Sequence, residues 1–455
     1  MQNAKFQKRL FGTNGVRGVA GKDLTPDLVL TIGEALGTMR KGCIAVGRDT
    51  RTSGETLVKA VKSGLLSTGC TVVDCGILPT PALQYLVKEQ FDGGAMITAS
   101  HNPPEYNGVK IIEADGTEMG DEETLKLEQL IFDRSFFPLP WEHVGHEIPA
   151  PDLVRKYVNA IVHHFPDKEG SGMTVVVDPG SGPSCLTTPQ ILTRMGCRVL
   201  TLNGIMDGNF PGRLPEPSPD GLRTLADLVV SCGAAFGVAH DGDADRSVFI
   251  DEKGRFIEEN QEFALIARHM CHQKKGALVT PVSTSRMVEK VVKDEGCTVH
   301  YTPVGSIYVA RTMLSLIGEG KTVVFGGEGN GGLIFPDHQF CRDGGMTAAM
   351  MVHILSSHKQ QLSALIDTLP QRTMIKDKIN TPHGARVLED IKKIYMNETL
   401  DLTDGVKIIR ENSWALIRAS GTEPVIRIII DAECGDYCRE FHNELMDHIS
   451  AINKE

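Results

Sequence analysis

A Gly-Cys-x-Val pattern occurs three times in this chain, each time between a stretch with helical periodicity and a run rich in β-branched residues. The copies are GLLSTGCTVVDCG at residues 64–76, ILTRMGCRVLTLNG at 191–204 and VVKDEGCTVHYTPVG at 291–305. The glycine is typical of a left-handed residue that ends a helix, and the residues after it predict a strand. Repetition at this scale indicates repeated structural units, so the pattern predicts three similar domains.

Each copy continues through a second helical stretch to another glycine and a second apolar strand. Polar loops then follow: TASHNPPEYNG after Ile97, DGDADR after His240 and GGEGNGG after Phe325. Strands that alternate with helices indicate βαβ units with mainly parallel pairing, in which ligands gather at the carboxyl ends of the strands. The four matching positions alone could recur by chance, because many helix-to-strand connections share this pattern. The second helical stretch, glycine and strand that follow each copy favour a true repeat.

The tail after Pro370 has a different rhythm. It reads as a strand, a helix from Ala385 to Tyr395, three further strands and a last helix. This order predicts an α+β domain with an antiparallel sheet and one helical face. The predicted fold is therefore three similar α/β domains at residues 1–150, 151–251 and 252–368, followed by an α+β domain at residues 369–455.

Composition excludes several classes of protein. The net charge of −11, without a cluster of Lys and Arg, argues against a nucleic-acid partner. No run approaches the roughly 18 apolar residues of a membrane span, and the first residues lack the apolar segment of a signal peptide, so we expect a cytoplasmic protein without a membrane partner. The 11 Cys residues are scattered, which favours reduced thiols over a zinc site or a disulfide framework.

The DGDADR loop carries the strongest metal signal. Asp241, Asp243 and Asp245 alternate along the chain after a strand, so three carboxylates can converge on one hard cation such as Mg²⁺ or Ca²⁺. An EF-hand would place Glu252 at its twelfth position, but its sixth position is Arg246 instead of Gly, and a strand precedes it. The remaining alternative is a solvated acidic turn. With a metal bound, Arg246 could neutralise a phosphoryl group.

The TASHNPP loop offers a carrier for such a group. Ser100 stands at the end of a strand, His101 follows it, and Lys110 lies ten residues further on. The two prolines stiffen the loop against helix formation. On spacing alone, however, a serine next to a histidine is more often a turn residue than a nucleophile.

Two further loops have compositions that suit a sugar phosphate. GGEGNGG formally matches a dinucleotide fingerprint, but another strand follows where a helix should begin, so we reject cofactor binding there. Glu328 and Asn330 would suit sugar hydroxyls, although a glycine-rich hairpin turn is the alternative. In RASGTEP, Arg418, Ser420, Gly421 and Thr422 suit a phosphate cradle.

These motifs together resemble those of the α-D-phosphohexomutases, in particular the archaeal branch of phosphoglucosamine mutases and phosphomannomutases. The resemblance extends from FGTNGVRG at Phe11 through GRDTRTSG, TASHNPPEYNGVK, DGDADR and GEGNGG to RASGTEP. It implies three α/β domains and a smaller fourth domain around a central active-site cleft. It also implies an isomerase that interconverts hexose 6-phosphate and hexose 1-phosphate through a phosphoserine and a bound hexose 1,6-bisphosphate, which also serves as activator.

The resemblance implies a role for each loop. Ser100 would be the phosphoserine and would bind Mg²⁺ together with Asp241, Asp243 and Asp245. Arg17, His101, Lys110 and Arg246 would line the reaction centre, with Lys110 as an acid/base. Glu328 and Asn330 would contact the sugar, and Arg418, Ser420, Gly421 and Thr422 would hold the phosphate that does not react.

The chain departs from the family pattern at a few positions. Gly332 stands where His is common, and Ser306 stands where a charged or imidazole side chain is common. His338 and Arg342 are candidates to replace those contacts.

The resemblance favours glucosamine phosphate as the substrate, with mannose, glucose and pentose phosphates as alternatives. A non-catalytic sugar-phosphate sensor and a Mg²⁺-dependent phosphatase are the competing functions.

Overall fold

The computed structural model describes residues 10–12, 15–419 and 425–452, which fall into two compact units. The first unit comprises Met1–Glu258 and Gly331–Asp367, and the second comprises Glu259–Asn330 and Thr368–Glu455. Each unit is described by itself. No helix among the described residues is long and apolar enough to cross a membrane. All eleven cysteines lie within the described residues and are free thiols in the structure.

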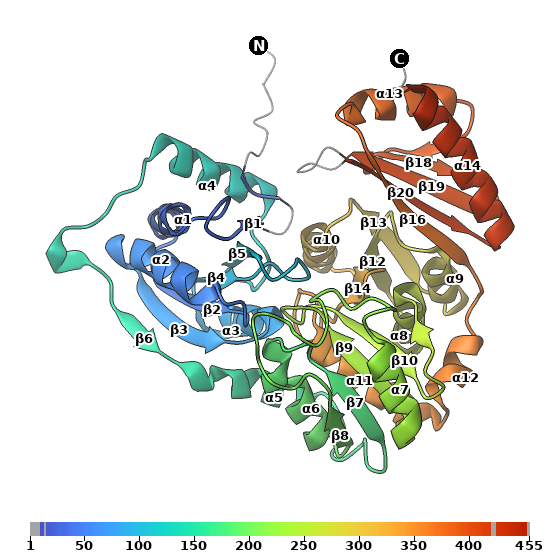
Figure 1. Cartoon of the computed structure of the whole chain (residues 1–455), viewed down its shortest axis with the longest axis horizontal. Helices are drawn as coiled ribbons and strands as arrows, with labels where there is room; N and C mark the ends of the chain where they lie inside the picture. The colour runs from blue at the N-terminus through green and yellow to red at the C-terminus, as the bar shows by residue number, and fades with distance from the viewer. Residues whose placement is uncertain (1–9, 13–14, 420–424, 453–455) are drawn as a thin grey trace. The chain divides into compact units, whose positions relative to one another are not determined.

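The first sheet of the first unit has the strand order β1-β5-β4-β2-β3-β6. Its strands and helices, shown in blue and teal in Figure 1, are β1 (Val16–Val19), α1 (Pro26–Met39), β2 (Cys43–Arg48), α2 (Gly54–Ser67), β3 (Thr71–Ile77), α3 (Thr80–Gln90), β4 (Gly93–Ile97), β5 (Tyr106–Glu113), α4 (Asp121–Asp133) and β6 (Glu147–Pro149). β2 pairs in parallel with β3 and β4, and β5 adds an antiparallel edge next to β4.

The second sheet of this unit repeats the arrangement, with the order β11-β10-β9-β7-β8. The elements of this region are α5 (Val154–His163), β7 (Thr174–Asp178), α6 (Thr188–Arg194), β8 (Arg198–Thr201), α7 (Arg223–Cys232), β9 (Phe236–His240), β10 (Ser247–Asp251) and β11 (Phe256–Ile257), with β15 (Gly332–Ile334), α11 (Gly344–His358) and α12 (Leu362–Asp367) from later in the chain. β7 pairs in parallel with β8 and β9, and β10 adds an antiparallel strand next to β9.

The second unit contains the third copy of the repeat. Its elements are α8 (Glu259–Gln273), β12 (Ala277–Pro281), α9 (Arg286–Asp294), β13 (Thr298–Thr302), α10 (Ser306–Gly318) and β14 (Val323–Glu328). β12 pairs in parallel with β13 and β14. In all three copies the glycine of Gly-Cys-x-Val has a positive φ, at Gly69, Gly196 and Gly296, and ends the turn between a helix and the next strand. The predicted repeat is therefore confirmed at the level of local structure.

The tail forms an antiparallel sheet with the order β16-β20-β19-β18-β17. Its elements, drawn in orange and red in Figure 1, are β16 (Thr373–Asn380), α13 (Gly384–Ile394), β17 (Thr399–Asp401), β18 (Val406–Ile409), β19 (Ser413–Ala419), β20 (Val425–Ala432) and α14 (Gly435–Ile452). Alternate residues of β19 face two cores. Ala415 and Ile417 pack with α13 and α14, whereas Trp414 and Leu416 pack with Val282 on the other face. The predicted α+β class is confirmed.

Candidate active site

The loop after β4 holds Ser100 in an unusual conformation. Its φ is 51°, in the left-handed region that residues other than glycine rarely adopt. The side chain is fully buried, and its hydroxyl donates a 2.7 Å hydrogen bond to Asp241 Oδ2. A strained, buried serine persists only where its surroundings fix it, and such residues concentrate at functional sites.

Arg51 holds this loop in place through hydrogen bonds to backbone carbonyl oxygens. Its Nη2 donates to the carbonyl oxygens of Ser100 (2.7 Å) and Asn102 (2.6 Å). Its Nη1 donates to those of Pro103 (2.5 Å) and Tyr106 (2.9 Å). The guanidinium is fully buried, so four backbone carbonyls of one loop share a single cation that water does not screen.

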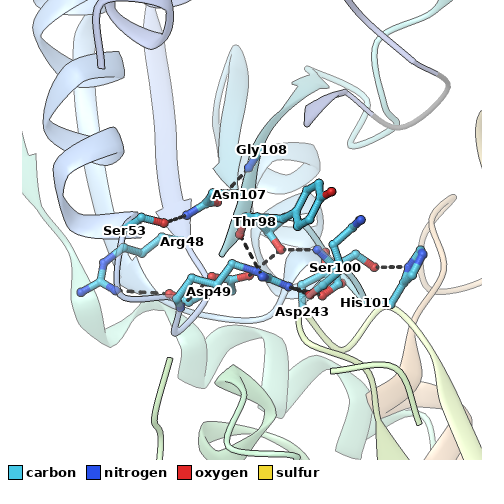
Figure 2. A network of polar contacts seen from close by, with 12 residues as sticks. Arg48, Asp49, Ser53, Thr98, Ser100, His101, Asn107, Gly108 and Asp243 are labelled. Atoms are coloured by element: carbon cyan, nitrogen blue, oxygen red, sulfur yellow. Dashed lines mark hydrogen bonds and ion pairs between the residues drawn. The ribbon is translucent and has the colours of Figure 1, made fainter. Parts of the chain in front are cut away.

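Asp49 and Thr98 complete the support, as Figure 2 shows. Asp49 Oδ2 accepts hydrogen bonds from Arg51 Nε (3.1 Å) and from the Thr98 hydroxyl (2.7 Å). The Thr98 Oγ1 in turn accepts the backbone N–H of Ser100 at 2.9 Å. Sequence reasoning gave none of these residues a role, although Asp49 and Arg51 lie in the GRDTRTSG motif, which was the available signal.

The three aspartates of DGDADR follow β9 and meet beside Ser100. All are buried, and their ligand oxygens lie within 4.8 Å of one another. Gly242 allows this approach, because a Cβ at that position would lie 2.3 Å from the Ser100 carbonyl oxygen. Asp243 Oδ1 and Asp245 Oδ1 are buried and have no hydrogen-bond partner among the described residues. Unpaired buried carboxylate oxygens at this spacing suit a hard divalent cation.

Two cations and a hydroxyl bind the Oδ2 atoms of Asp243 and Asp245. Lys110, on β5, places its Nζ 2.8 Å from Asp243 Oδ2 and 3.1 Å from Asp245 Oδ2. Arg342 Nη2 lies 2.5 Å from Asp245 Oδ2, and the Thr80 hydroxyl donates to Asp243 Oδ2 at 2.6 Å. The Oδ1 atoms of both aspartates are thus left for a ligand.

The pKa values of this cluster diverge. Burial, and then the neighbouring Asp245 and Asp243, raise the pKa of Asp241 well above its ordinary value. Burial also disfavours ionised Asp243 and Asp245, but the cations outweigh it and lower the pKa of both. Burial opposes the Lys110 ammonium, yet the two aspartates raise its pKa. Lys110 is therefore protonated at neutral pH in this arrangement.

Two arginines in the same region have unused donors. Arg17, on β1, donates from Nη1 to Asn102 Oδ1 at 2.9 Å. Arg17 Nη2 and Arg246 Nε are buried and have no hydrogen-bond partner within the part of the chain that the structure describes. A phosphate would satisfy such donors, since guanidinium groups bind its oxygens strongly. The site therefore offers unpaired acceptors for a cation and unpaired donors for an anion.

His101 also lies at this site, with its Nδ1 3.4 Å from Ser100 Oγ. Burial, then the Arg246 and Arg17 charges, lower the pKa of His101 to about 3. The imidazole is therefore neutral, and its 3.6 Å contact with Glu216 is not an ion pair at neutral pH. His101 is suited to donate or accept a hydrogen bond without carrying charge.

We expect His101 to remain neutral between pH 5 and 8, because its pKa is lowered to about 3. In the unfolded chain the same imidazole titrates near about 6.5. Between about pH 6.5 and 3, only the unfolded state binds a proton on this imidazole. The contribution of His101 to the free energy of unfolding therefore becomes less favourable as the pH falls through this range. An NMR titration of the imidazole Cε1–H, assigned by its loss in His101→Gln, measures this pKa. A midpoint above about 5.5 would contradict the expectation.

The predicted sugar and phosphate residues lie in the second unit. Glu328 ends β14 and is 6% exposed, and the Asn330 backbone N–H donates to its carbonyl oxygen at 2.8 Å. Arg418, on β19, pairs with Asp404 at 2.8 Å, and its Nε is buried with no hydrogen-bond partner among the described residues. Ser420, Gly421 and Thr422 lie outside the described residues.

The positions that depart from the family pattern are all buried. Ser306 begins α10, and Gly332 begins β15. His338 stacks on Tyr85 with a centroid distance of 5.0 Å. Arg342, considered above as a substitute phosphate contact, instead pairs with Asp245.

Comparison with known proteins places all four regions in one family. Sequence models described as phosphoglucomutase/phosphomannomutase match residues 8–137 (alpha/beta/alpha domain I), 155–254 (domain II), 258–373 (domain III) and 375–447 (C-terminal domain). The phosphoglucomutase/phosphomannomutase of Thermococcus kodakarensis is 44% identical over 95% of this chain and 96% of its own length. The phosphoglucosamine/phosphogalactosamine mutase of Sulfurisphaera tokodaii is 39% identical over 96% of this chain and 98% of its own length.

Solved structures agree with this assignment. The crystal structure of a phosphoglucomutase/phosphomannomutase family protein from Burkholderia thailandensis is 25% identical and superimposes with a TM-score of 0.85 over 97% of both chains. Family matches along nearly the whole sequence, together with relatives of this identity, leave one assignment. The chain belongs to the phosphoglucomutase/phosphomannomutase family.

Proposed function

We propose that this protein is a phosphosugar mutase that interconverts hexose 6-phosphate and hexose 1-phosphate through a phosphorylated Ser100, with glucosamine phosphate as the favoured substrate. One observation carries the proposal: the Ser100 hydroxyl lies against Asp241, in a site where buried acceptors on Asp243 and Asp245 and buried donors on Arg17 and Arg246 have no hydrogen-bond partner among the described residues. Relatives named as mutases of hexose phosphates support it.

The donor set fits a magnesium ion. Three carboxylates supply oxygen ligands, and one oxygen of a Ser100 phosphate would supply another. When bound there, Mg²⁺ would supply neutralisation of charge on the transferring phosphoryl group.

The residues of the chain divide the remaining work. Arg17 and Arg246 would hold the non-bridging oxygens of the phosphate with the donors that are now unused. The attacking sugar hydroxyl forms a new O–P bond as the bond between Ser100 Oγ and phosphorus breaks, and the net effect on protons is to move one from the sugar hydroxyl to Oγ. Lys110, which the two aspartates keep protonated at neutral pH despite its burial, would give a proton to Oγ and regain one from the sugar hydroxyl.

A second binding region would orient the sugar. We assign Glu328 and Asn330 to the sugar hydroxyls, and Arg418 with Ser420, Gly421 and Thr422 to the phosphate that does not react. The buried Nε of Arg418 supports this assignment, because it has no hydrogen-bond partner within the described ranges of the chain. After the first transfer, the bound hexose 1,6-bisphosphate would turn end for end and return its other phosphate to Ser100. The domain limits proposed from the sequence, at residues 150, 251 and 368, give each domain one of these loops.

The choice of sugar is the finer part of the proposal. The two relatives named above differ in it, one for glucose and mannose phosphates and the other for amino sugar phosphates. Glu328 can accept hydrogen bonds from a hydroxyl or from a 2-ammonium group.

Turnover of the 1-phosphates of glucosamine, mannose, glucose and ribose under one condition tests the proposal. We expect isomerisation of at least one hexose phosphate, fastest for glucosamine, and a protein species about 80 Da heavier that carries a phosphoryl group on Ser100. Steady release of inorganic phosphate would identify a phosphatase instead. Binding without isomerisation would identify a sensor, and equal rates on all four sugars would exclude a dedicated glucosamine enzyme.

A further inference from the structure

Arg342 lies outside the motifs of the sequence and yet reaches the aspartate triad. It lies between β15 and α11, its side chain is 2% exposed, and its Nη2 is 2.5 Å from Asp245 Oδ2, across 97 positions of the chain. A buried guanidinium at this distance forms a strong, geometrically specific contact with a carboxylate.

The two carboxylate oxygens of Asp245 have different surroundings. Arg342 and Lys110 both donate to Oδ2, whereas Oδ1 has no hydrogen-bond partner among the described residues. Asp243 shows the same division: Lys110 and Thr80 donate to Oδ2, and Oδ1 has no hydrogen-bond partner in the part of the chain that the structure describes. Protein groups thus occupy one oxygen of each carboxylate and leave the other available.

Asp343, the next residue after Arg342, is anchored by several buried hydrogen bonds. The Asp343 carboxylate caps α11 by accepting the Met346 N–H at 2.9 Å, and it also accepts the Tyr157 hydroxyl at 2.5 Å and the Gln339 amide at 2.7 Å. The start of α11 also packs closely on the DGDADR loop, since a Cβ at Gly344 would lie 2.9 Å from the Ala244 carbonyl oxygen. The backbone therefore fixes the origin of the Arg342 side chain relative to Asp245.

We propose that Arg342 is a positioning residue of the cation site, which holds the Asp245 carboxylate with Oδ1 turned toward a divalent metal. The proposal rests on the proposed function only for the identity of the metal. Hydrogen bonds to the outer oxygens of metal ligands orient them, and their loss typically weakens metal binding about 10- to 100-fold.

Two consequences of removing Arg342 oppose each other, so the sign of the effect is informative. Loss of a positive charge near the site would favour cation binding. Loss of orientation would disfavour it, because Arg246 Nε lies 3.8 Å from Asp245 Oδ1 and has no hydrogen-bond partner within the described part of the chain. A carboxylate freed from Arg342 could turn Oδ1 onto Arg246 and withdraw it from the metal. We expect this competition to dominate.

The experiment is titration of Mn²⁺ into the full chain, followed by water-proton relaxation. All variants carry Ser100→Ala, so that phosphorylation cannot differ between them. We expect Arg342→Met to weaken Mn²⁺ binding about 10- to 100-fold and Arg342→Lys to weaken it less. The matched control is Arg223→Met, because the Arg223 side chain is 78% exposed and pairs only with Asp220 among the contacts described; it should change binding less than about twofold.

Several results would overturn the assignment. Unchanged or tighter Mn²⁺ binding by Arg342→Met would show that Arg342 does not orient a ligand, and absence of Mn²⁺ binding by the parent protein would remove the site itself. If Arg342→Met does not fold, as judged by circular dichroism, Arg342→Lys decides, and binding equal to the parent then contradicts the proposal. A parent that binds Mn²⁺ as expected but fails the sugar-phosphate assay in its Ser100 form would overturn the proposed function and leave Arg342 as a metal-site residue.

Discussion

Replacement of Ser100 by alanine is expected to lower mutase turnover at least about 10⁴-fold, the scale of loss seen when a covalent nucleophile is removed. The Ser100 hydroxyl is fully buried and lies 2.7 Å from Asp241 Oδ2, beside the carboxylates that would hold the metal. Phosphate monoesters react very slowly in water, and the remaining residues would only bind and orient the sugar phosphate. The measurement is isomerisation rate with hexose 1,6-bisphosphate supplied, together with intact protein mass.

Ser184→Ala is a suitable control for this experiment. Ser184 is also fully buried, but among the described residues its hydroxyl makes only a 3.5 Å contact with the Pro179 carbonyl oxygen, and it lies in the 3-10 helix Pro183–Leu186. We expect this variant to keep both its activity and the phosphorylated species. If Ser100→Ala retained most of its turnover, or if the added phosphoryl group persisted in it, phosphoryl transfer through Ser100 would be wrong.

The repeated elements of the fold could be predicted because their signals are local. A glycine at positions 69, 196 and 296 each time adopts a positive φ, and the β-branched residues that follow pair as strands next to the preceding parallel strand. Helix stops and strand propensity depend on a few neighbouring residues, so one sequence is enough to recognise them. The convergence of Asp241, Asp243 and Asp245 followed from the same kind of reasoning, since alternation on an extended chain is also local.

The supports of the site could not be predicted in this way. Arg342 meets Asp245 across 97 positions, and Thr80 meets Asp243 across 163. The reach of a long side chain depends on how separate elements pack, and nothing in the residues around position 342 distinguishes a buried ion pair from a surface charge. The sequence also left β17 undetected, because a three-residue edge strand carries too short an alternation to recognise.

Arg51→Met is expected to lower the free energy of unfolding by about 3–5 kcal/mol, the cost of removing one partner of a buried ion pair. The substitution leaves the Asp49 carboxylate buried without its cation, and it leaves the carbonyl oxygens of Ser100, Asn102, Pro103 and Tyr106 without this donor. Each buried carbonyl that loses its partner adds a desolvation cost. Urea denaturation followed by circular dichroism measures the change.

The same variant tests whether the left-handed conformation of Ser100 depends on the hydrogen bonds from Arg51. Arg51→Lys keeps a positive charge but lacks the planar fork that reaches four carbonyls, so we expect it to restore only part of the stability and little of the turnover. Arg48→Met is the matched control, because the one hydrogen bond of the Arg48 side chain to the described residues is a longer 3.3 Å contact with the Asp49 carbonyl oxygen; this variant should lower the free energy of unfolding by less than about 1 kcal/mol. Asp49→Asn combined with Arg51→Met should be less destabilising than the sum of the two single changes, since the double variant buries no unpaired charge. Wild-type stability in Arg51→Met would show that the loop keeps Ser100 in its left-handed conformation without Arg51, and the positioning role given to this guanidinium would then be wrong.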